Sequence, residues 1–243
     1  MTTNSLFNRN LNDFLVTSSM GGVDRTLTTS NTVNAANSAA TIIAQVAGAA
    51  SGDPSFKSSV AGVNTWAFGT DNSDAQKFKV SQGGAVGLND TAKCTTAGQW
   101  NYPLQPSFRV YQSVPIPNVT GDNTFYDIPF NTTDFDIGGN VVAGVFTAPI
   151  DGKYIFTFVA ALNGIDDATH TTVESFIAVT GIPFAAASRN RATASSYGVI
   201  YFTNSCIVHL VAGNTVHCTV EAEAGAKTVG VMVNSAFAGH LLS

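Results

Sequence analysis

Large apolar residues alternate with other residues through the C-terminal part of the chain, and this alternation constrains the fold more than any other feature. Tyr154, Phe156 and Phe158 are spaced two apart, and successive side chains of a β-strand point to opposite faces. The three aromatic rings therefore share one face of a predicted strand. Pro and Gly separate further runs of this kind, and no helical period persists over residues 101–243. This half of the chain therefore predicts a β-sandwich.

Residues 31–100 have a different texture. Gly, Asn, Asp and Pro interrupt them roughly every 8–12 residues, a spacing typical of short strands in all-β structure. The runs between the breaks predict strands over residues 56–60, 65–68 and 77–80. Residues 35–50 are ambiguous, because their Ala content favours a helix whereas Thr41-Ile42-Ile43 favours a strand; we expect the strand.

This middle region is poor in large apolar residues for its length. A single chain cannot bury a core there, whereas three copies wound together can, because each copy supplies one face of a shared interior. We therefore expect an extended, trimeric, β-rich stalk over residues 31–100. Residues 1–30 precede it as an attachment segment, and a head domain over residues 101–243 follows it.

The composition excludes several function classes. Charged residues are 11% of the chain and the net charge is −5, with no basic cluster of the kind that neutralises phosphates, so we expect no binding to nucleic acid. No apolar run reaches the ~18 residues of a membrane span, and the N-terminus lacks the pattern of a signal peptide. The three cysteines have no disulfide or zinc spacing.

Residues 146–158 read Phe-Thr-Ala-Pro-Ile-Asp-Gly-Lys-Tyr-Ile-Phe-Thr-Phe. This segment resembles the signature of the complement component 1q globular head and the wider tumour-necrosis-factor superfamily: Phe, five residues, Gly, then Tyr, Phe and Phe at alternate positions. Phe125 and Asn131 have the family's Phe-to-Asn spacing, Phe135 falls one residue early, and residues 235–242 are similar to its closing strand. The resemblance covers about residues 106–242 and implies a ten-strand jelly roll that assembles as a homotrimer.

The middle region resembles a segment of bacteriophage tail fibres. The residues that carry this likeness are Gly52-Asp53-Pro54, Trp66-Ala67-Phe68-Gly69, Asp71-Asn72-Ser73-Asp74 and Lys77-Phe78-Lys79-Val80-Ser81. Together with the head, it implies a structural protein of the virion tail or baseplate, made in the host cytoplasm. Its N-terminal segment would dock onto another tail protein, and its trimeric head would bind a glycan or protein on the host surface. The alternatives are a secreted or surface bacterial binding protein with the same head, and a polysaccharide-degrading tail spike.

The head also predicts where a target would be contacted. If the first strand of the jelly roll leads away from the stalk and the last returns to it, residues 163–171, 188–196 and 224–234 form the connections that face away from the stalk. These connections hold the candidate binding residues, which are Asp166, Asp167, His170, Arg189, Arg191 and Lys227. Charges prefer loops in any case, but a charged rim also suits recognition of a surface ligand.

The sequence gives little support for catalysis. Glycoside hydrolysis needs two carboxylates at a fixed separation, and the candidates in the head are the adjacent Asp166 and Asp167 or Glu221 and Glu223, which we expect to be solvated charges at a strand edge. His209 and His217 are expected as half-buried residues on adjacent strands. No nucleophile elbow or phosphate loop occurs. We expect a protein with no catalytic residues, no cofactor and no metal; the adjacent aspartates alone are weak evidence for calcium.

Overall fold

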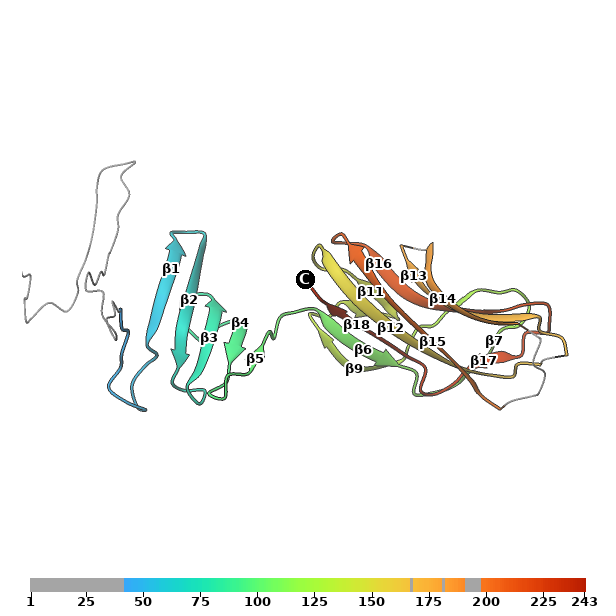
Figure 1. The fold of residues 1–243 in the computed structure, drawn as a ribbon, viewed down its shortest axis with the longest axis horizontal. Helices are drawn as coiled ribbons and strands as arrows, with labels where there is room; N and C mark the ends of the chain where they lie inside the picture. Colours follow the sequence, from blue (N-terminus) through green and yellow to red (C-terminus); the bar gives the residue numbers. More distant parts are fainter. Residues whose placement is uncertain (1–41, 167, 181, 191–197) are drawn as a thin grey trace, which may run out of the picture.

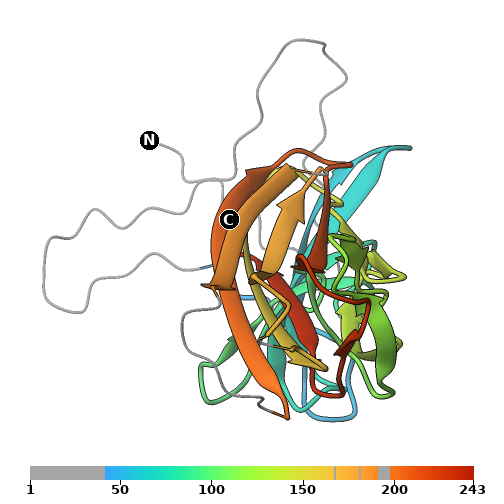
Figure 2. The same cartoon turned by 90° about the vertical axis from the view of Figure 1, so that its right-hand side faces the viewer.

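The computed structural model describes residues 42–166, 168–180, 182–190 and 198–243, and these residues form β-strands and no helix. The predicted all-β fold is therefore confirmed. A small sheet comes first and a larger sandwich follows it along the long axis of the molecule (Figure 1). Figure 2 views the molecule along that axis, with the strands of the sandwich in front of the small sheet. Over these ranges no helix has the length and hydropathy to cross a membrane.

The small sheet, which we call the stalk sheet, has five antiparallel strands in sequence order. They are β1 (Ser55–Val60), β2 (Asn64–Asp71), β3 (Lys77–Gln82), β4 (Asp90–Cys94) and β5 (Trp100–Asn101). The predicted strands over residues 56–60, 65–68 and 77–80 fall within β1, β2 and β3. The strand expected within residues 35–50 is wrong for its described part. Residues 42–46 are coil, residues 47–48 are bends and residues 49–50 are a turn.

The sandwich, which we call the head, consists of two sheets. The seven-stranded sheet runs in the order β7-β17-β12-β18-β6-β9, with β15 on the free side of β12. Its strands are β6 (Ser107–Tyr111), β7 (Ile116–Thr120), β9 (Thr132–Ile137), β12 (Gly152–Asn163), β15 (Ile200–Leu210), β17 (Val229–Val231) and β18 (Ala236–Leu241). The long strand β12 is central, because it pairs with β15 on one side and with β18 and β17 on the other.

The six-stranded sheet lies against this one. It runs in the order β10-β11-β16-β13-β14, and β8 also pairs with β16. Its strands are β8 (Tyr126–Asp127), β10 (Val141–Val142), β11 (Val145–Thr147), β13 (Thr172–Val179), β14 (Ile182–Asn190) and β16 (Thr215–Ala222). Consecutive strands repeatedly change sheets, which is the connectivity of a jelly roll.

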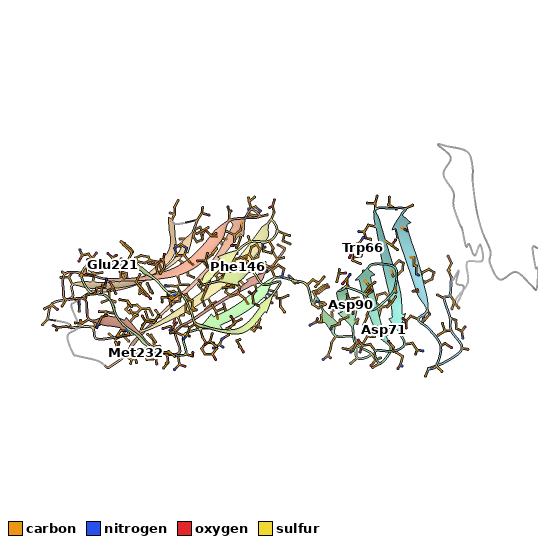
Figure 3. The ribbon with its side chains drawn as sticks, turned by 180° about the vertical axis from the view of Figure 1, so that it is seen from behind. Trp66, Asp71, Asp90, Phe146, Glu221 and Met232 are labelled. Atoms are coloured by element: carbon orange, nitrogen blue, oxygen red, sulfur yellow. The ribbon has the colours of Figure 1, made fainter. Side chains whose placement is uncertain are left out.

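The core fills the space between the two sheets of the head. Tyr154, Phe156 and Phe158 all point into it and are completely buried, as the alternation predicted. Phe108, Phe146 and Phe237 join them in a cluster of stacked and edge-on rings whose centroids lie 4.9–6.3 Å apart. Figure 3 labels Phe146 within the sandwich. Aromatic pairs at these separations add to the stability that burial provides.

The pairing expected for two histidines is wrong. His209 lies on β15 and His217 on β16, but β15 pairs with β12 in one sheet whereas β16 pairs with β13 in the other. The turn at Gly213 and Asn214 therefore carries the chain from one sheet to the other and does not form a hairpin. A local turn motif cannot reveal this difference, because it depends on which partner each strand finds in the sandwich.

Candidate binding surfaces

Three loops meet at the end of the head that lies away from the stalk sheet (Figure 1). These distal loops are residues 121–125 between β7 and β8, the described residues 164–166 and 168–171 between β12 and β13, and residues 223–228 between β16 and β17. Their backbones bind one another: the amide of Gly225 donates to the carbonyl of Gly121 at 2.8 Å, and the amide of Asn123 donates to the carbonyl of Ala222 at 3.0 Å. The loops thus form one connected surface.

His170 holds two of these loops together. Its side chain is 2% exposed, its Nδ1 accepts a hydrogen bond from the backbone amide of Asp166 at 2.9 Å, and its Nε2 lies 3.0 Å from the carbonyl oxygen of Ala226. Nδ1 must be unprotonated to accept, so the proton sits on Nε2, which donates to the carbonyl. The histidine is therefore a structural link beneath the surface, and its ring is not displayed to solvent.

The other predicted binding residues fall into three groups. Asp166 and Lys227 are exposed on neighbouring distal loops. The backbone of Arg189 lies near the end of β14, opposite Val173. Asp167 and Arg191 lie outside the described residues, so their assignment to this surface stays a prediction.

Sequence reasoning missed the loop of residues 121–125. Its Asp122 is exposed, and a hydrogen bond from the hydroxyl of Thr124 at 2.6 Å, with a smaller contribution from the charge of Lys227, lowers the pKa of that carboxyl. The sequence signal that could have revealed this loop is Gly121-Asp122-Asn123, three residue types that favour turns and interrupt strands. Gly121 has a φ of +136°, and a Cβ there would lie 1.9 Å from the carbonyl oxygen of Ala226, so only glycine permits this approach between loops.

The outward side of the seven-stranded sheet carries exposed apolar side chains among polar ones, and nothing in the described residues of the chain covers it. Ile155 of β12 pairs with Ile207 of β15, which is 59% exposed, and Tyr201 and Phe135 are 59% and 43% exposed on the same sheet. A groove of about 330 Å³ runs between Phe135, Ile155 and Ala238, among others. We call this side the open face of the head.

A family model describes this jelly roll. The model for the C1q domain matches residues 113–242, which is more than half of the chain. The chain belongs to the C1q domain family. C1q and tumour-necrosis-factor-like domains typically assemble as trimers and bind ligands or receptors, and they are generally binding domains without enzymatic activity. The predicted resemblance of the head is thereby confirmed.

Several solved structures resemble the C1q domain of this chain. They include the globular domain of zebrafish complement 1qA protein, at 16% identity and a TM-score of 0.41, covering 57% of this chain and 98% of that one. Murine APRIL at pH 5.0 matches at 11% identity and a TM-score of 0.40, covering 56% and 96%. Murine APRIL at pH 8.5 matches at 10% identity and a TM-score of 0.41, covering 57% and 99%. The search of curated proteins gave no match.

The outer side of the six-stranded sheet of the C1q domain carries acidic residues. Glu221 of β16 lies directly opposite Glu174 of β13, and Glu223 follows two residues later. The expectation of solvated charges at a strand edge is wrong for Glu221, because β16 is an internal strand and this residue is only 6% exposed. Burial raises the pKa of the Glu221 carboxyl, and the charges of Glu223 and Glu174 raise it further.

The two sides of the stalk sheet contrast sharply. One side buries the ammonium of Lys79, which binds Asp71 and Asp74 at 2.8 Å each and Asp90 at 3.0 Å; Figure 3 labels Asp71 and Asp90 close together. The loop of residues 83–89 lies over this side, where the amide of Gly87 donates to the hydroxyl of Ser81. The charges are thus satisfied within one chain.

The other side of the stalk sheet is aromatic and uncovered within the described residues. Cross-strand pairing and the two-residue alternation place on it Phe56, Trp66, Phe68, Phe78 and Trp100, each 39% to 53% exposed. The rings of Phe56 and Phe68 stack at 5.6 Å. We call this side the aromatic face of the stalk sheet.

The described residues hold no group of three or more His, Cys, Asp or Glu side chains arranged to bind a metal ion. Asp166 lies among them, but its neighbour Asp167 lies outside them.

Proposed function

We propose that the protein is a structural component of a bacteriophage tail or baseplate, a fibre whose trimeric C1q head binds a glycan or protein on the host-cell surface. The observation that supports this most strongly is the stalk sheet. This sheet buries charged side chains and exposes aromatic ones. A sheet that is stable as a monomer buries its aromatic side chains and exposes its charged ones. A β-rich stalk followed by a binding head suits a fibre that reaches from a particle to a cell.

The trimer follows from two uncovered faces in one chain. Domains of this family form homotrimers, so three heads that pack through their open faces would bring three stalk sheets together. The three aromatic faces could then cover one another around a common axis. Burial of such rings is worth about 1.5–3 kcal/mol for a large apolar side chain, which a lone chain would forgo.

Binding to the host would use the end of the head that lies away from the stalk. The distal loops display Asp122, Asp166 and Lys227, and the predicted rim adds the two arginines at positions 189 and 191. Residues 1–30, which lie outside the described residues, would attach the fibre to another tail or baseplate protein. On this proposal the protein is located in the virion.

The first test is the native mass. Three chains of 25.2 kDa each are expected, and Ile207→Glu on the open face should dissociate them, because three ionised carboxylates would be buried at the interface. Ile207 is 59% exposed in one chain, so the variant should still fold. Val142→Glu on β10, where the side chain is 73% exposed on the other sheet, is the matched control. A monomeric wild-type protein would contradict the proposal.

The second test concerns the role on the particle. The protein should co-purify with phage particles, and Arg189→Ala combined with Arg191→Ala should reduce adsorption to host cells while the trimer remains intact. Normal adsorption of that variant would show that Arg189 and Arg191 do not contribute to binding of the host surface. Export of the protein by an uninfected bacterium would favour a secreted binding protein instead, and release of reducing sugar from host envelopes would favour a depolymerase.

A further inference from the structure

Glu221 occupies an unusual position on the outer side of the six-stranded sheet. It is only 6% exposed, yet its carboxylate has no hydrogen-bond or ion-pair partner among the described residues of the chain. The buried Asp71 of the stalk sheet shows the contrast, since it binds Lys79 at 2.8 Å and accepts further hydrogen bonds from Ser73. A carboxylate with so little exposure and no partner is costly, and a cation that paired with it would offset that cost.

The surroundings of Glu221 add negative charge and no balancing positive charge. Glu174 lies directly opposite it on β13, and the charges that act on its carboxyl are those of Glu223 and Glu174. The nearby cation Lys227 acts instead on Asp122 in the distal loops. Two neighbouring carboxylates thus repel the charge of Glu221, and no lysine or arginine of the described residues is among the charges that act on it.

An aromatic ring borders the same point. Phe125 precedes β8, and the register of β8 with β16 (Tyr126 opposite Val220), continued by one residue, brings Phe125 beside Glu221. Its ring centroid lies 6.0 Å from that of Phe176 on β13. Because β16 lies between β8 and β13 and neighbouring strands are about 4.8 Å apart, the two rings meet over β16. Phe125 is 59% exposed, so its outer face is free for a ligand.

The carboxylate can be reached from solvent. Among the described residues, Oε1 of Gln112 is the side-chain oxygen that has neither a hydrogen-bond partner nor contact with solvent. The oxygens of Glu221 also lack a partner, but they keep some contact with solvent. Figure 3 labels Glu221 towards the end of the head that lies away from the stalk sheet. Glu221 lies on the outer side of the six-stranded sheet, whereas the open face of the head belongs to the seven-stranded sheet. A trimer packed through the open faces would therefore leave Glu221 accessible.

We propose that Glu221, Glu174, Glu223 and Phe125 form a binding site for a primary ammonium group carried by an amino sugar. The carboxylates of Glu221 and Glu174 would accept charge-assisted hydrogen bonds from the ammonium, and the face of Phe125 would pack against the ring of the sugar while adding cation–π attraction. A calcium ion is a poorer occupant, because it takes six to eight oxygen ligands and the described residues offer no metal-binding group here.

This site does not depend on the proposed tail-fibre role, because it is a property of the purified head. The test is a calorimetric titration of the full-length protein at pH 6, where the amines are mostly protonated, with a tetramer of glucosamine and with a tetramer of N-acetylglucosamine as the neutral counterpart. The free amine should bind, and the acetylated tetramer should bind at least about tenfold more weakly, since loss of a charged hydrogen bond is worth about 1.5–3 kcal/mol.

Variants separate this site from general attraction to an acidic protein. Glu221→Gln should weaken binding of the glucosamine tetramer about tenfold or more, and Phe125→Leu should weaken it severalfold. Asp151→Asn removes the same charge from the end of the head near the stalk and should leave binding unchanged. Far-ultraviolet circular dichroism would verify that each variant is folded.

Three results would overturn the proposal. Equal binding of the two tetramers would show that the amine is not recognised. Equal loss of binding in Glu221→Gln and Asp151→Asn would reduce the effect to net charge. Tighter binding of a lysine-rich peptide than of the glucosamine tetramer, or calcium binding that Glu221→Gln abolishes, would assign the site to a different ligand.

Discussion

Replacing Lys79 by methionine should destabilise the stalk sheet strongly. Methionine keeps the length of the side chain but removes its charge, and the ammonium of Lys79 is the shared partner of three carboxylates at 2.8–3.0 Å. The loss of the ion pair would cost most at Asp71, because both its side chain and that of Lys79 are only 6% exposed. Asp74 is 38% exposed and also binds Lys77 at 2.6 Å, so solvent and that second lysine would still compensate it.

The expected cost comes from the most buried pair. Removing one partner of a buried ion pair costs about 3–5 kcal/mol, because the remaining charge stays desolvated. Lys77→Met is the matched control: its ammonium is 30% exposed and binds Asp74 alone, and exposed pairs are worth about 0–1 kcal/mol. The two substitutions make the same chemical change two residues apart on β3, so their difference measures what burial and the additional carboxylate partners of Lys79 contribute.

Hydrogen exchange measures this effect locally in the full chain. Protection of the β2 and β3 amides should fall about hundredfold or more in Lys79→Met, since each tenfold corresponds to about 1.4 kcal/mol. It should change by less than about tenfold in Lys77→Met. Amides of β12 in the head should be unaffected. Equal protection in the two variants, or no loss in Lys79→Met, would refute the view that this ion cluster holds one side of the stalk sheet.

The pH dependence of Lys79→Met gives an internal check. Burial alone raises the pKa of the Asp71 carboxyl, but the hydrogen bonds and the charge of Lys79 outweigh it and lower the pKa below 3.8. In the wild type this group therefore contributes stability that is present above about pH 3.8 and is lost on acidification. Without Lys79 only the raising effect of burial and weaker hydrogen bonds remain, so protonation at low pH should partly restore the variant.

Three further predictions concern the head. Glu221→Gln should raise the melting temperature at pH 7 and have no effect near pH 4, because a raised carboxyl pKa makes the folded chain lose stability as the pH rises above about 4.5; thermal melts across this range would test the sign. His170→Leu should increase proteolysis of the distal loops, since the hydrogen bonds of its ring to the backbone of Asp166 and Ala226 would be lost, each worth about 0.5–1.5 kcal/mol; an unchanged digestion pattern would contradict the link. Gly239→Ala should cost about 1–3 kcal/mol in denaturant unfolding, because its Cβ would lie 2.6 Å from two core Phe rings; a neutral result would mean that the core adapts.

The local alternation of residues determined much of the fold. Tyr154, Phe156 and Phe158 share one face because side chains alternate along any strand, and all three are buried in the core. The first three strands of the stalk sheet were predictable from the breaks between them, and the family from residues 146–158; β4 and β5 were not predicted. Each of these features depends on residues close together in the sequence.

The tertiary structure decided which residues meet. Lys79 and Glu221 are both buried charged residues on β-strands. Lys79 contacts three carboxylates, whereas Glu221 lies opposite another glutamate. The link of His170 to Ala226 spans 56 residues of sequence. No pattern within one strand encodes such partners, because strand order and register are set by the packing of the whole sandwich. For that reason the sequence predicted the faces of the strands, and only the folded chain showed what those faces contact.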